Sequence, residues 1–140
     1  MIRKATIKDC QSVAEMMMNM TMEVSPEYAS HEFLDYKQET MNHFTKETDT
    51  IYVDDAHKGF FIVRDEVECT TPSLHRIVGM KVYIRPEHRN GFLLAEFYKK
   101  LFVDYPNGDI MGVTEIGSKH IAVLEKRHER VANVYRLKRS

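Results

Sequence analysis

Apolar residues in the first third of the chain recur at spacings of three and four, a pattern typical of amphipathic helices. This pattern predicts a first helix over residues 10–22 with Asp9 at its N-cap, and a second over about 31–46 with Ser30 as its cap. Methionine is both a flexible core filler and a component of adaptable binding surfaces, so two interpretations of the first helix stay open, and core packing is preferred. Its five methionines are Met16, Met17, Met18, Met20 and Met22.

Shorter apolar or alternating runs predict strands, and these dominate the rest of the chain. The predicted strands cover residues 2–7, 50–54, 60–64, 76–84, 109–114 and 130–137. Further helices are expected at about 90–105 and 117–126. The resulting order, β-α-α-β-β-β-α-β-α-β, predicts a mixed α/β (α+β) fold with helices on both faces of one sheet, and a single domain over 1–140. The strands at 76–84 and 109–114 flank a crossover helix and should be parallel.

Composition excludes several classes of protein. Twenty basic and 21 acidic residues give a net charge of −1, which argues against a protein that coats nucleic acid. No apolar run is long enough to span a membrane and charges interrupt the start of the chain, so we expect a cytoplasmic protein with no membrane partner. Cys10 and Cys69 are expected to be free thiols. The seven histidines lack the spacing of zinc ligands, so no metal is expected.

Residues 78–94 combine an apolar strand, a proline, a basic turn with one glycine, and the start of an amphipathic helix. The first turn of a helix leaves backbone N–H groups unpaired, and the helix dipole adds partial positive charge there. A strand that leads into a helix through a turn containing Gly91 therefore predicts an anion-binding site.

The chain resembles the GCN5-related N-acetyltransferase (GNAT) family over its whole length. The resemblance is best at residues 82–91, which are similar to the family's acetyl-coenzyme A motif of a strand, a proline and Arg/Gln-x-x-Gly-x-Gly/Ala before a helix. It implies a GNAT-like acyl-CoA N-acyltransferase fold, acetyl-CoA as cofactor, and a small amine or protein amine as acceptor. Residues 85–91 also resemble short GNAT-like proteins carried by bacteriophages. The apolar faces of the predicted final strand leave room for a homodimer.

The resemblance also implies which residues contact the cofactor. Backbone groups of Val82, Tyr83 and Ile84 would meet the pantetheine arm where the two parallel strands splay apart. The turn and the first helical residues would hold the pyrophosphate, mainly through backbone N–H groups. These residues are Arg89, Asn90, Gly91, Phe92, Leu93 and Leu94. The sequence departs from the family here, because in either register a leucine, Leu93 or Leu94, replaces a small residue.

Acetyl transfer to an amine requires a base, because the attacking nitrogen must be neutral, and a proton donor for the leaving thiolate. The resemblance puts Glu125 where many family members have a tyrosine acid, and a glutamate donates poorly unless burial raises its pKa. The strand at 76–84 carries no acidic residue to act as the base, which leaves Glu115 as the nearest substitute. Further candidates are Tyr83, Ser118 and His120.

Two functions of different classes fit these observations. The first is an N-acetyltransferase that uses direct attack by an amine, and residues Glu23, Glu27 and Tyr28 could meet its cationic acceptor. The second is a catalytically inactive GNAT-fold protein, an interaction module or a virion-associated protein. The intact strand–proline–turn–helix order favours the first function, and the departures at the two leucines and Glu125 favour the second.

Overall fold

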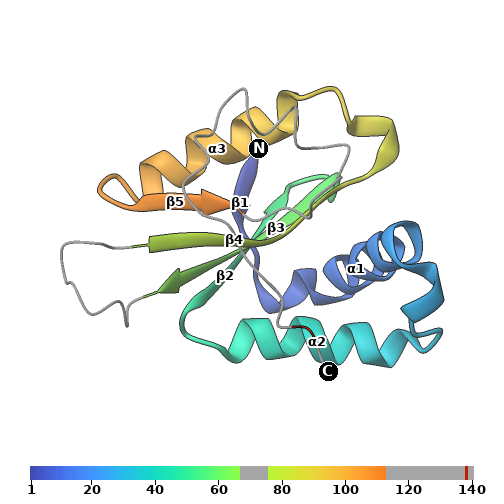
Figure 1. The fold of residues 1–140 in the computed structure, drawn as a ribbon. Coiled ribbons are helices and arrows are strands. Elements are labelled where there is room, and N and C mark those ends of the chain that lie inside the picture. The colour runs from blue at the N-terminus through green and yellow to red at the C-terminus, as the bar shows by residue number, and fades with distance from the viewer. Residues whose placement is uncertain (67–75, 113–137, 139–140) are drawn as a thin grey trace.

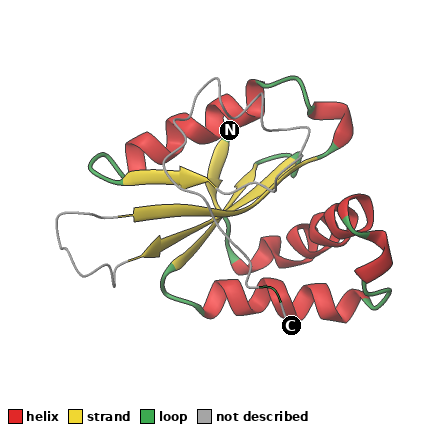
Figure 2. Cartoon of the chain, viewed as in Figure 1, coloured by secondary structure: helices red, strands yellow, loops and turns green. Residues whose placement is uncertain are grey.

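A computed structural model of the chain describes residues 1–66, 76–112 and 138 (Figures 1 and 2). A five-stranded sheet in the order β1-β2-β3-β4-β5 forms its centre. The strands are β1 (Ile2–Lys4), β2 (Asp49–Asp54), β3 (Gly59–Glu66), β4 (Arg76–Ile84) and β5 (Asp109–Gly112). The first four are antiparallel neighbours, whereas β5 is parallel to β4. The predicted mixed sheet and its parallel pair are therefore confirmed.

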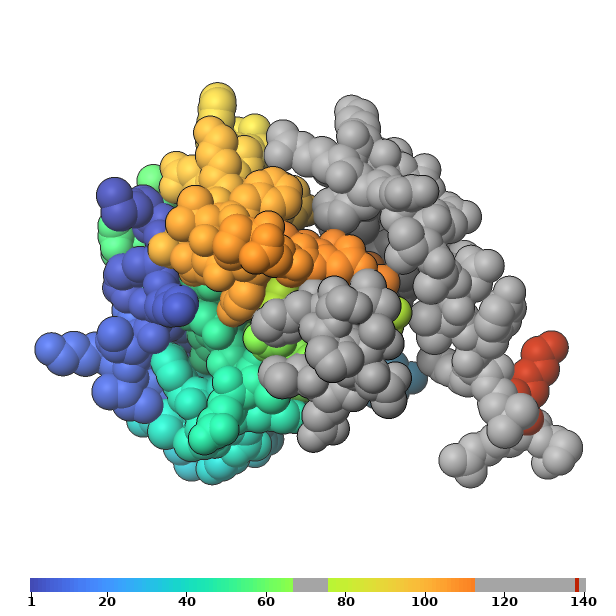
Figure 3. All heavy atoms as spheres, turned by 90° about the vertical axis from the view of Figure 1, so that its left-hand side faces the viewer, coloured from blue at the N-terminus to red at the C-terminus, as the bar shows by residue number. Residues whose placement is uncertain are grey.

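Helices cover both faces of the sheet. Helices α1 (Cys10–Val24) and α2 (Phe33–Thr45) lie on one face, and α3 (Phe92–Asp104) lies on the other (Figure 1). The space-filling view shows α3 and the two N-terminal helices on opposite sides of the strands (Figure 3). None of the helices in the described ranges has the length and apolar character needed to cross a membrane. The helix and strand predicted at 117–126 and 130–137 lie outside the described residues.

Alternation of side chains along the strands produces two hydrophobic cores, one on each face of the sheet. The core under α1 and α2 contains Val13, Ala14, Met16, Met17, Tyr36, Ile51, Val53, Phe60, Ile62 and Tyr83. The core under α3 contains Ile2, Tyr52, Phe61, Val63, Ile77, Leu93, Phe97 and Leu101. In the second core the rings of Phe61 and Phe97 stack with centroids 4.0 Å apart, which fixes α3 over β3.

The methionine-rich run packs mainly into the first core. Met16 and Met17 are fully buried, and Met18 and Met20 pack against the same cluster while remaining partly exposed. The interpretation of these residues as core fillers therefore holds for the four of them.

A β-bulge changes the faces to which the residues of β4 point. Val63 is opposite Gly79 and Ile62 is opposite Lys81, so Met80 is the extra residue. In an unbroken strand Ile77 and Tyr83 would point to the same face, since side chains alternate with a period of two. Instead Ile77 lies in the core under α3 and Tyr83 in the core under α1 and α2. The bulge therefore reorients the end of β4 that leads into the predicted cofactor loop.

Asp49 connects α2 to the sheet through a fully buried carboxylate. Arg64 donates a hydrogen bond to it from Nε at 2.7 Å, and Nδ1 of His43 is hydrogen-bonded to it at 2.8 Å. Burial raises the pKa of Asp49, but the hydrogen bonds and charges of Arg64 and His43 outweigh this effect and hold the pKa at about 2. The carboxylate is therefore ionised in the folded protein at neutral pH.

Asp9 occupies the N-cap position of α1, as predicted, but its carboxylate does not cap that helix. It accepts hydrogen bonds from the Arg3 guanidinium at 2.8 and 2.9 Å and from the backbone N–H of Thr6 at 2.8 Å. His57 is hydrogen-bonded to the same carboxylate at 2.9 Å. The hydrogen bond from Arg3 is the main reason that the pKa of Asp9 lies well below its usual range. Asp9 thus joins β1, α1 and the β2–β3 turn.

The predicted end of the first strand and the predicted start of the second helix were wrong by three and two residues. Strand β1 ends at Lys4, because the chain then enters a 3-10 turn at Ile7–Asp9. Helix α2 begins at Phe33 with Glu32 at its N-cap, not with Ser30 as the cap. The Ser30 hydroxyl instead accepts a hydrogen bond from the backbone N–H of Glu32 at 3.1 Å, a local turn that precedes the helix.

Replacing Asp49 should destabilise the fold in a pH-dependent way. We expect Asp49→Asn to lower the free energy of unfolding by about 2 kcal/mol at neutral pH, because Arg64 loses a buried partner. The folded-state pKa of Asp49 lies below the ordinary carboxyl value, so its contribution is complete above that value and is lost as the pH falls through the folded-state pKa. Urea unfolding at several pH values measures the difference between wild type and variant.

The difference in unfolding free energy between wild type and Asp49→Asn should shrink as the pH is lowered from about 5 to about 3. Glu47→Gln is a matched control, because Glu47 is exposed and the substitution removes the same charge. A loss for Asp49→Asn that stays constant over this range, or that equals the loss for Glu47→Gln, would contradict the assigned role of the carboxylate.

Candidate cofactor site

The edge of β4 that faces β5 is only partly paired. The described residues of β5 pair with residues 76–79 of β4 and leave residues 80–84 without a partner from that strand. On the other edge, the backbone N–H of Arg85 donates to the carbonyl of Lys58 at 2.8 Å, so the backbone groups of Arg85 face β3. Along a strand the backbone N–H and C=O groups of successive residues point to opposite edges. The backbone groups of Tyr83 therefore point toward β3, and those of Val82 and Ile84 point toward the β5 side.

Residues 82–84, predicted to face the cofactor, thus contribute differently. The N–H groups of Val82 and Ile84 and the carbonyl of Val82 point to the open edge, whereas the carbonyl of Ile84 accepts a hydrogen bond from Nε of Arg89 at 2.7 Å. Tyr83 is buried in the core under α1 and α2, so its ring serves the core rather than the edge. A linear ligand with amide groups can pair with such an edge as an added strand does.

Gly91 determines where α3 begins. Its φ of 88° lies in the left-handed region, so the helix starts at Phe92 and not at residue 90 as predicted. The side-chain carbonyl of Asn90 accepts the N–H of Phe92 at 3.1 Å. Within the described part of the chain, the N–H groups of Gly91, Leu93 and Leu94 form no hydrogen bond. Three donors and the positive end of the helix dipole therefore lie together, as an anion site requires.

The two leucines that replace small residues turn out to pack inward. Leu93 is buried in the core under α3, and a Cβ built on Gly59 would lie 3.2 Å from its Cδ2. The same Cβ would lie 2.6 Å from the carbonyl oxygen of Tyr83, so only glycine fits at position 59. Leu94 packs partly against this core, whereas Phe92 is 75% exposed. The bulky side chains of Leu93 and Leu94 therefore serve the core, and their backbone N–H groups remain at the helix end.

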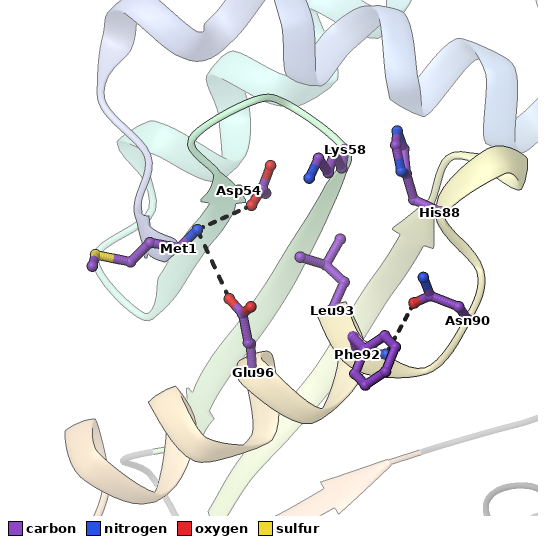
Figure 4. Close-up of a pocket in the computed structure, with 8 residues that line it drawn as sticks. All are labelled: Met1, Asp54, Lys58, His88, Asn90, Phe92, Leu93 and Glu96. Atoms are coloured by element: carbon purple, nitrogen blue, oxygen red, sulfur yellow. Dashed lines mark hydrogen bonds and ion pairs between the residues drawn. The ribbon is translucent and has the colours of Figure 1, made fainter.

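A pocket of about 270 Å³ lies beside the beginning of α3 (Figure 4). Lys58 lies between Asp54 and His88, and Asn90 follows on the loop before α3. Asp54 and Glu96 lie on either side of the α-ammonium of Met1, at 3.3 and 3.8 Å. The full lining is Met1, Asp54, Lys58, His88, Asn90, Phe92, Leu93 and Glu96. Of these lining side chains, those of Lys58, His88 and Asn90 can donate hydrogen bonds to an anionic group.

Arg89 connects the loop to α1. Its two Nη atoms donate to both carboxylate oxygens of Glu23, at 2.6 and 2.8 Å. Its guanidinium carbon lies 5.5 Å from the centroid of the Tyr83 ring, close enough for a cation–π contact. The hydrogen bond to Glu23 raises the pKa of Arg89. Glu23, which the sequence suggested as a contact for the acceptor, is therefore part of a link between α1 and the loop.

Sequence reasoning missed the pair formed by Lys81 and Glu39. Lys81 follows the bulge on β4, and its Nζ is hydrogen-bonded to the carboxylate of Glu39 on α2. A carboxylate thus reaches β4 from a helix although the strand itself carries no acid. The only sequence signal for this arrangement is Gly79, since a glycine inside a strand often marks a bulge.

The predicted catalytic residues Glu115, Ser118 and Glu125 lie outside the described residues, and so does His120. Their roles stay predictions. In the described ranges, no group of three His, Cys, Asp or Glu side chains is arranged to hold a metal ion.

No protein-family model matches the sequence, and no curated protein matches it. Solved structures match the fold over nearly the full length of both chains. A possible acetyltransferase from Clostridium difficile 630 is 18% identical with a TM-score of 0.77, covering 100% of this chain and 97% of that one. Ribosomal-protein-alanine N-acetyltransferase from Brucella melitensis biovar Abortus 2308 is 11% identical with a TM-score of 0.74, covering 100% and 98%. A predicted acetyltransferase from Clostridium acetobutylicum, solved with acetyl-CoA, is 11% identical with a TM-score of 0.72, covering 99% and 95%.

The chain has the GNAT acetyltransferase fold. This confirms the fold that the resemblance of residues 82–91 led us to expect. Identities this low show the fold alone, so any activity has to be argued from the site.

Substitutions at Gly91 test whether its backbone conformation starts the helix. A Cβ at this position would meet no atom within 4 Å, so the cost of a side chain comes only from the positive φ. We expect Gly91→Ala to lower the free energy of unfolding by about 1 kcal/mol, and Gly91→Asn by less, because asparagine adopts the left-handed conformation more readily. Thermal unfolding measures both.

Gly79→Ala is the control, since Gly79 does not have a positive φ and its Cβ would make an ordinary contact at 3.7 Å. Equal losses for alanine and asparagine at position 91 would refute this role.

Proposed function

We propose that the protein is an acetyl-CoA-dependent N-acetyltransferase that transfers an acetyl group directly to an amine. The observation that carries the proposal is the position of a strand edge, at Val82 and Ile84, immediately before the N-terminus of α3, both of which have N–H groups without a partner among the described residues. A solved structure with the same fold contains acetyl-CoA, which supports this choice of ligand.

The phosphate groups of the cofactor fit the beginning of α3. Pyrophosphate oxygens accept hydrogen bonds, and the N–H groups of Gly91, Leu93 and Leu94 are donors without partners in the described residues. Negative charge at a helix N-terminus is favourable by about 0.3–1 kcal/mol. Lys58 and His88, which line the adjoining pocket, can add to this attraction.

The pantetheine arm fits the open edge of β4. The arm is linear and carries amide groups, and the N–H and carbonyl of Val82 together with the N–H of Ile84 point to that edge. Such pairing depends on backbone groups, so the identities of these side chains matter little. This explains how a chain with a divergent sequence could keep the site.

The acceptor side of the site would be formed by α1 and α2. Acetyl-CoA supplies a reactive acetyl thioester, and the protein has to deliver a neutral amine to it. Glu39, whose carboxylate reaches β4, is a described group that could accept the amine's proton. Glu115, Ser118 and Glu125 remain proposed participants in proton transfer. We propose a small amine or a protein amine as the acceptor.

A non-catalytic binding protein is the second candidate, and the position of Lys81 favours it. Its ammonium lies on β4 on the side of α2, where a protonated amine would have to approach, and like charges repel. In this alternative the chain binds the cofactor or a protein partner through the same surface but transfers nothing.

Calorimetric titration with acetyl-CoA, combined with an assay for released CoA thiol, separates the two candidates. We expect a Kd between about 1 µM and 1 mM, typical of enzyme substrates, and thiol release with at least one amine of a panel of small amines and peptides. Absence of binding at millimolar acetyl-CoA would overturn the proposal. Binding without thiol release for any amine would support the second candidate.

Removing a single N–H group tests the assignment of the strand edge. Val82→Pro deletes an N–H that points away from β3, so the β3–β4 ladder should survive. We expect acetyl-CoA to bind about tenfold more weakly, the effect of losing one hydrogen bond, whereas Val82→Ala, which keeps the N–H, should bind nearly as well as wild type. Calorimetry gives both affinities, and circular dichroism verifies the fold. Unchanged affinity in the proline variant would show that the ligand does not pair with this edge.

A further inference from the structure

Arg89 connects two parts of the proposed site, the loop before α3 and the acceptor side formed by α1 and α2. It belongs to the loop before α3, and its partner Glu23 belongs to the last turn of α1, 66 residues earlier in the chain. Both of its Nη atoms donate to Glu23, and its Nε donates to the carbonyl of Ile84. The guanidinium is therefore already bound by protein groups on three of its donor hydrogens.

Among the residues that the structure describes, the loop that Arg89 anchors has few other contacts. The 3-10 turn at Pro86–His88 contains no buried residue, and its backbone hydrogen bonds are local, from His88 to Arg85 at 2.9 Å and from Arg89 to Pro86 at 3.3 Å. Arg85, just before the turn, donates to two carbonyls of the β2–β3 turn, from its side chain to His57 at 2.9 Å and from its backbone N–H to Lys58 at 2.8 Å. Core packing resumes only at Leu93, so the segment between is fixed mainly by polar contacts.

Contact with the Tyr83 ring restricts the side chain of Arg89. The Tyr83 ring is buried beside Phe60, with centroids 6.1 Å apart, and the guanidinium lies over it. A guanidinium that lies on an aromatic ring and donates from both Nη atoms is already ordered. Little further side-chain entropy is therefore lost when a ligand binds nearby. Such a group is well suited to hold a backbone in place.

We propose that Arg89 is a positioning residue of the cofactor site, which fixes the loop to α1 through Glu23 so that backbone amides, and not the guanidinium, receive the phosphate. The proposal deepens the proposed function and rests on it for the identity of the anion. The same ion pair would also hold the end of α1 in place on the proposed acceptor side, so it would order both parts of the site.

The two roles of Arg89 predict opposite effects of Glu23→Gln on acetyl-CoA affinity. If Arg89 bound phosphate directly, this substitution would free its guanidinium and remove a negative charge near the phosphate, so the affinity would rise. If Arg89 positions the loop, the weakened ion pair leaves the amides less ordered, and the affinity falls despite the favourable charge change. Glu27→Gln is the matched control, because this substitution removes the same charge. Glu27 is exposed in the next turn of the chain, and the contacts of Arg89 in the described residues do not include it.

Calorimetry with acetyl-CoA and amide hydrogen exchange on the ligand-free protein together test the proposal. For Glu23→Gln we expect about fivefold weaker binding and about fivefold faster exchange of the hydrogen-bonded loop amides, those of His88, Arg89 and Phe92, the scale of one exposed ion pair. Glu27→Gln should leave the exchange unchanged and bind at least as tightly as wild type. Tighter binding in Glu23→Gln, or unchanged exchange at the loop, would overturn the positioning role.

The exchange measurement keeps the proposal testable apart from the proposed function. If the wild-type protein binds no acetyl-CoA, the proposed function fails, while faster loop exchange in Glu23→Gln would still support the link between α1 and the loop. A double-mutant cycle of Glu23→Gln and Arg89→Gln adds a second readout. Non-additive effects on loop exchange support direct coupling of the two side chains, and additive effects contradict it.

Discussion

Strand β4 pairs in opposite senses on its two edges, and the rest of the site depends on this constraint. Its antiparallel partner β3 fixes which backbone groups face the other edge, where β5 runs parallel to only its first four residues in the described structure. The bulge at Met80 then reverses the faces, so Lys81 and Tyr83 point toward α1 and α2. Within the described residues, an edge with unpaired N–H groups next to a helix N-terminus follows from strand geometry, whatever side chains the strand carries.

Packing of α3 sets the direction in which its amides point. Phe97 stacks on Phe61, Leu93 fits against Gly59, and the hydroxyl of Tyr52 donates to Asp104 at 2.7 Å near the other end of the helix. These contacts fix the helix along its length, so the core positions the N–H groups at its N-terminus, where the phosphate is proposed to bind. The loop between β4 and α3 is short of such packing, which is why polar links from Arg89 and Arg85 matter there.

The fold was predictable from sequence because it depends on local signals. Hydrophobic spacing located the helices, and Gly91 before an apolar run located the turn that precedes α3. The pairs Glu23–Arg89 and Glu39–Lys81 were not predictable, since they join residues 66 and 42 positions apart and depend on how the elements pack. The bulge at Met80 had one sequence signal, Gly79, which does not determine the extra residue. Leu93 shows the limit of motif comparison: judged as an obstruction from the motif, it is a core residue in three dimensions.

In the proposed complex, one cofactor contacts both the β4 edge and the α3 N-terminus. Backbone amide resonances of 15N-labelled protein titrated with acetyl-CoA can reveal this, because each proposed donor reports its own environment. We expect the largest shifts at Val82, Ile84, Gly91, Leu93 and Leu94. Saturating acetyl-CoA that leaves these resonances in place, or that shifts only residues around Leu34 and Met41 on the outer side of α2, would contradict the proposed complex.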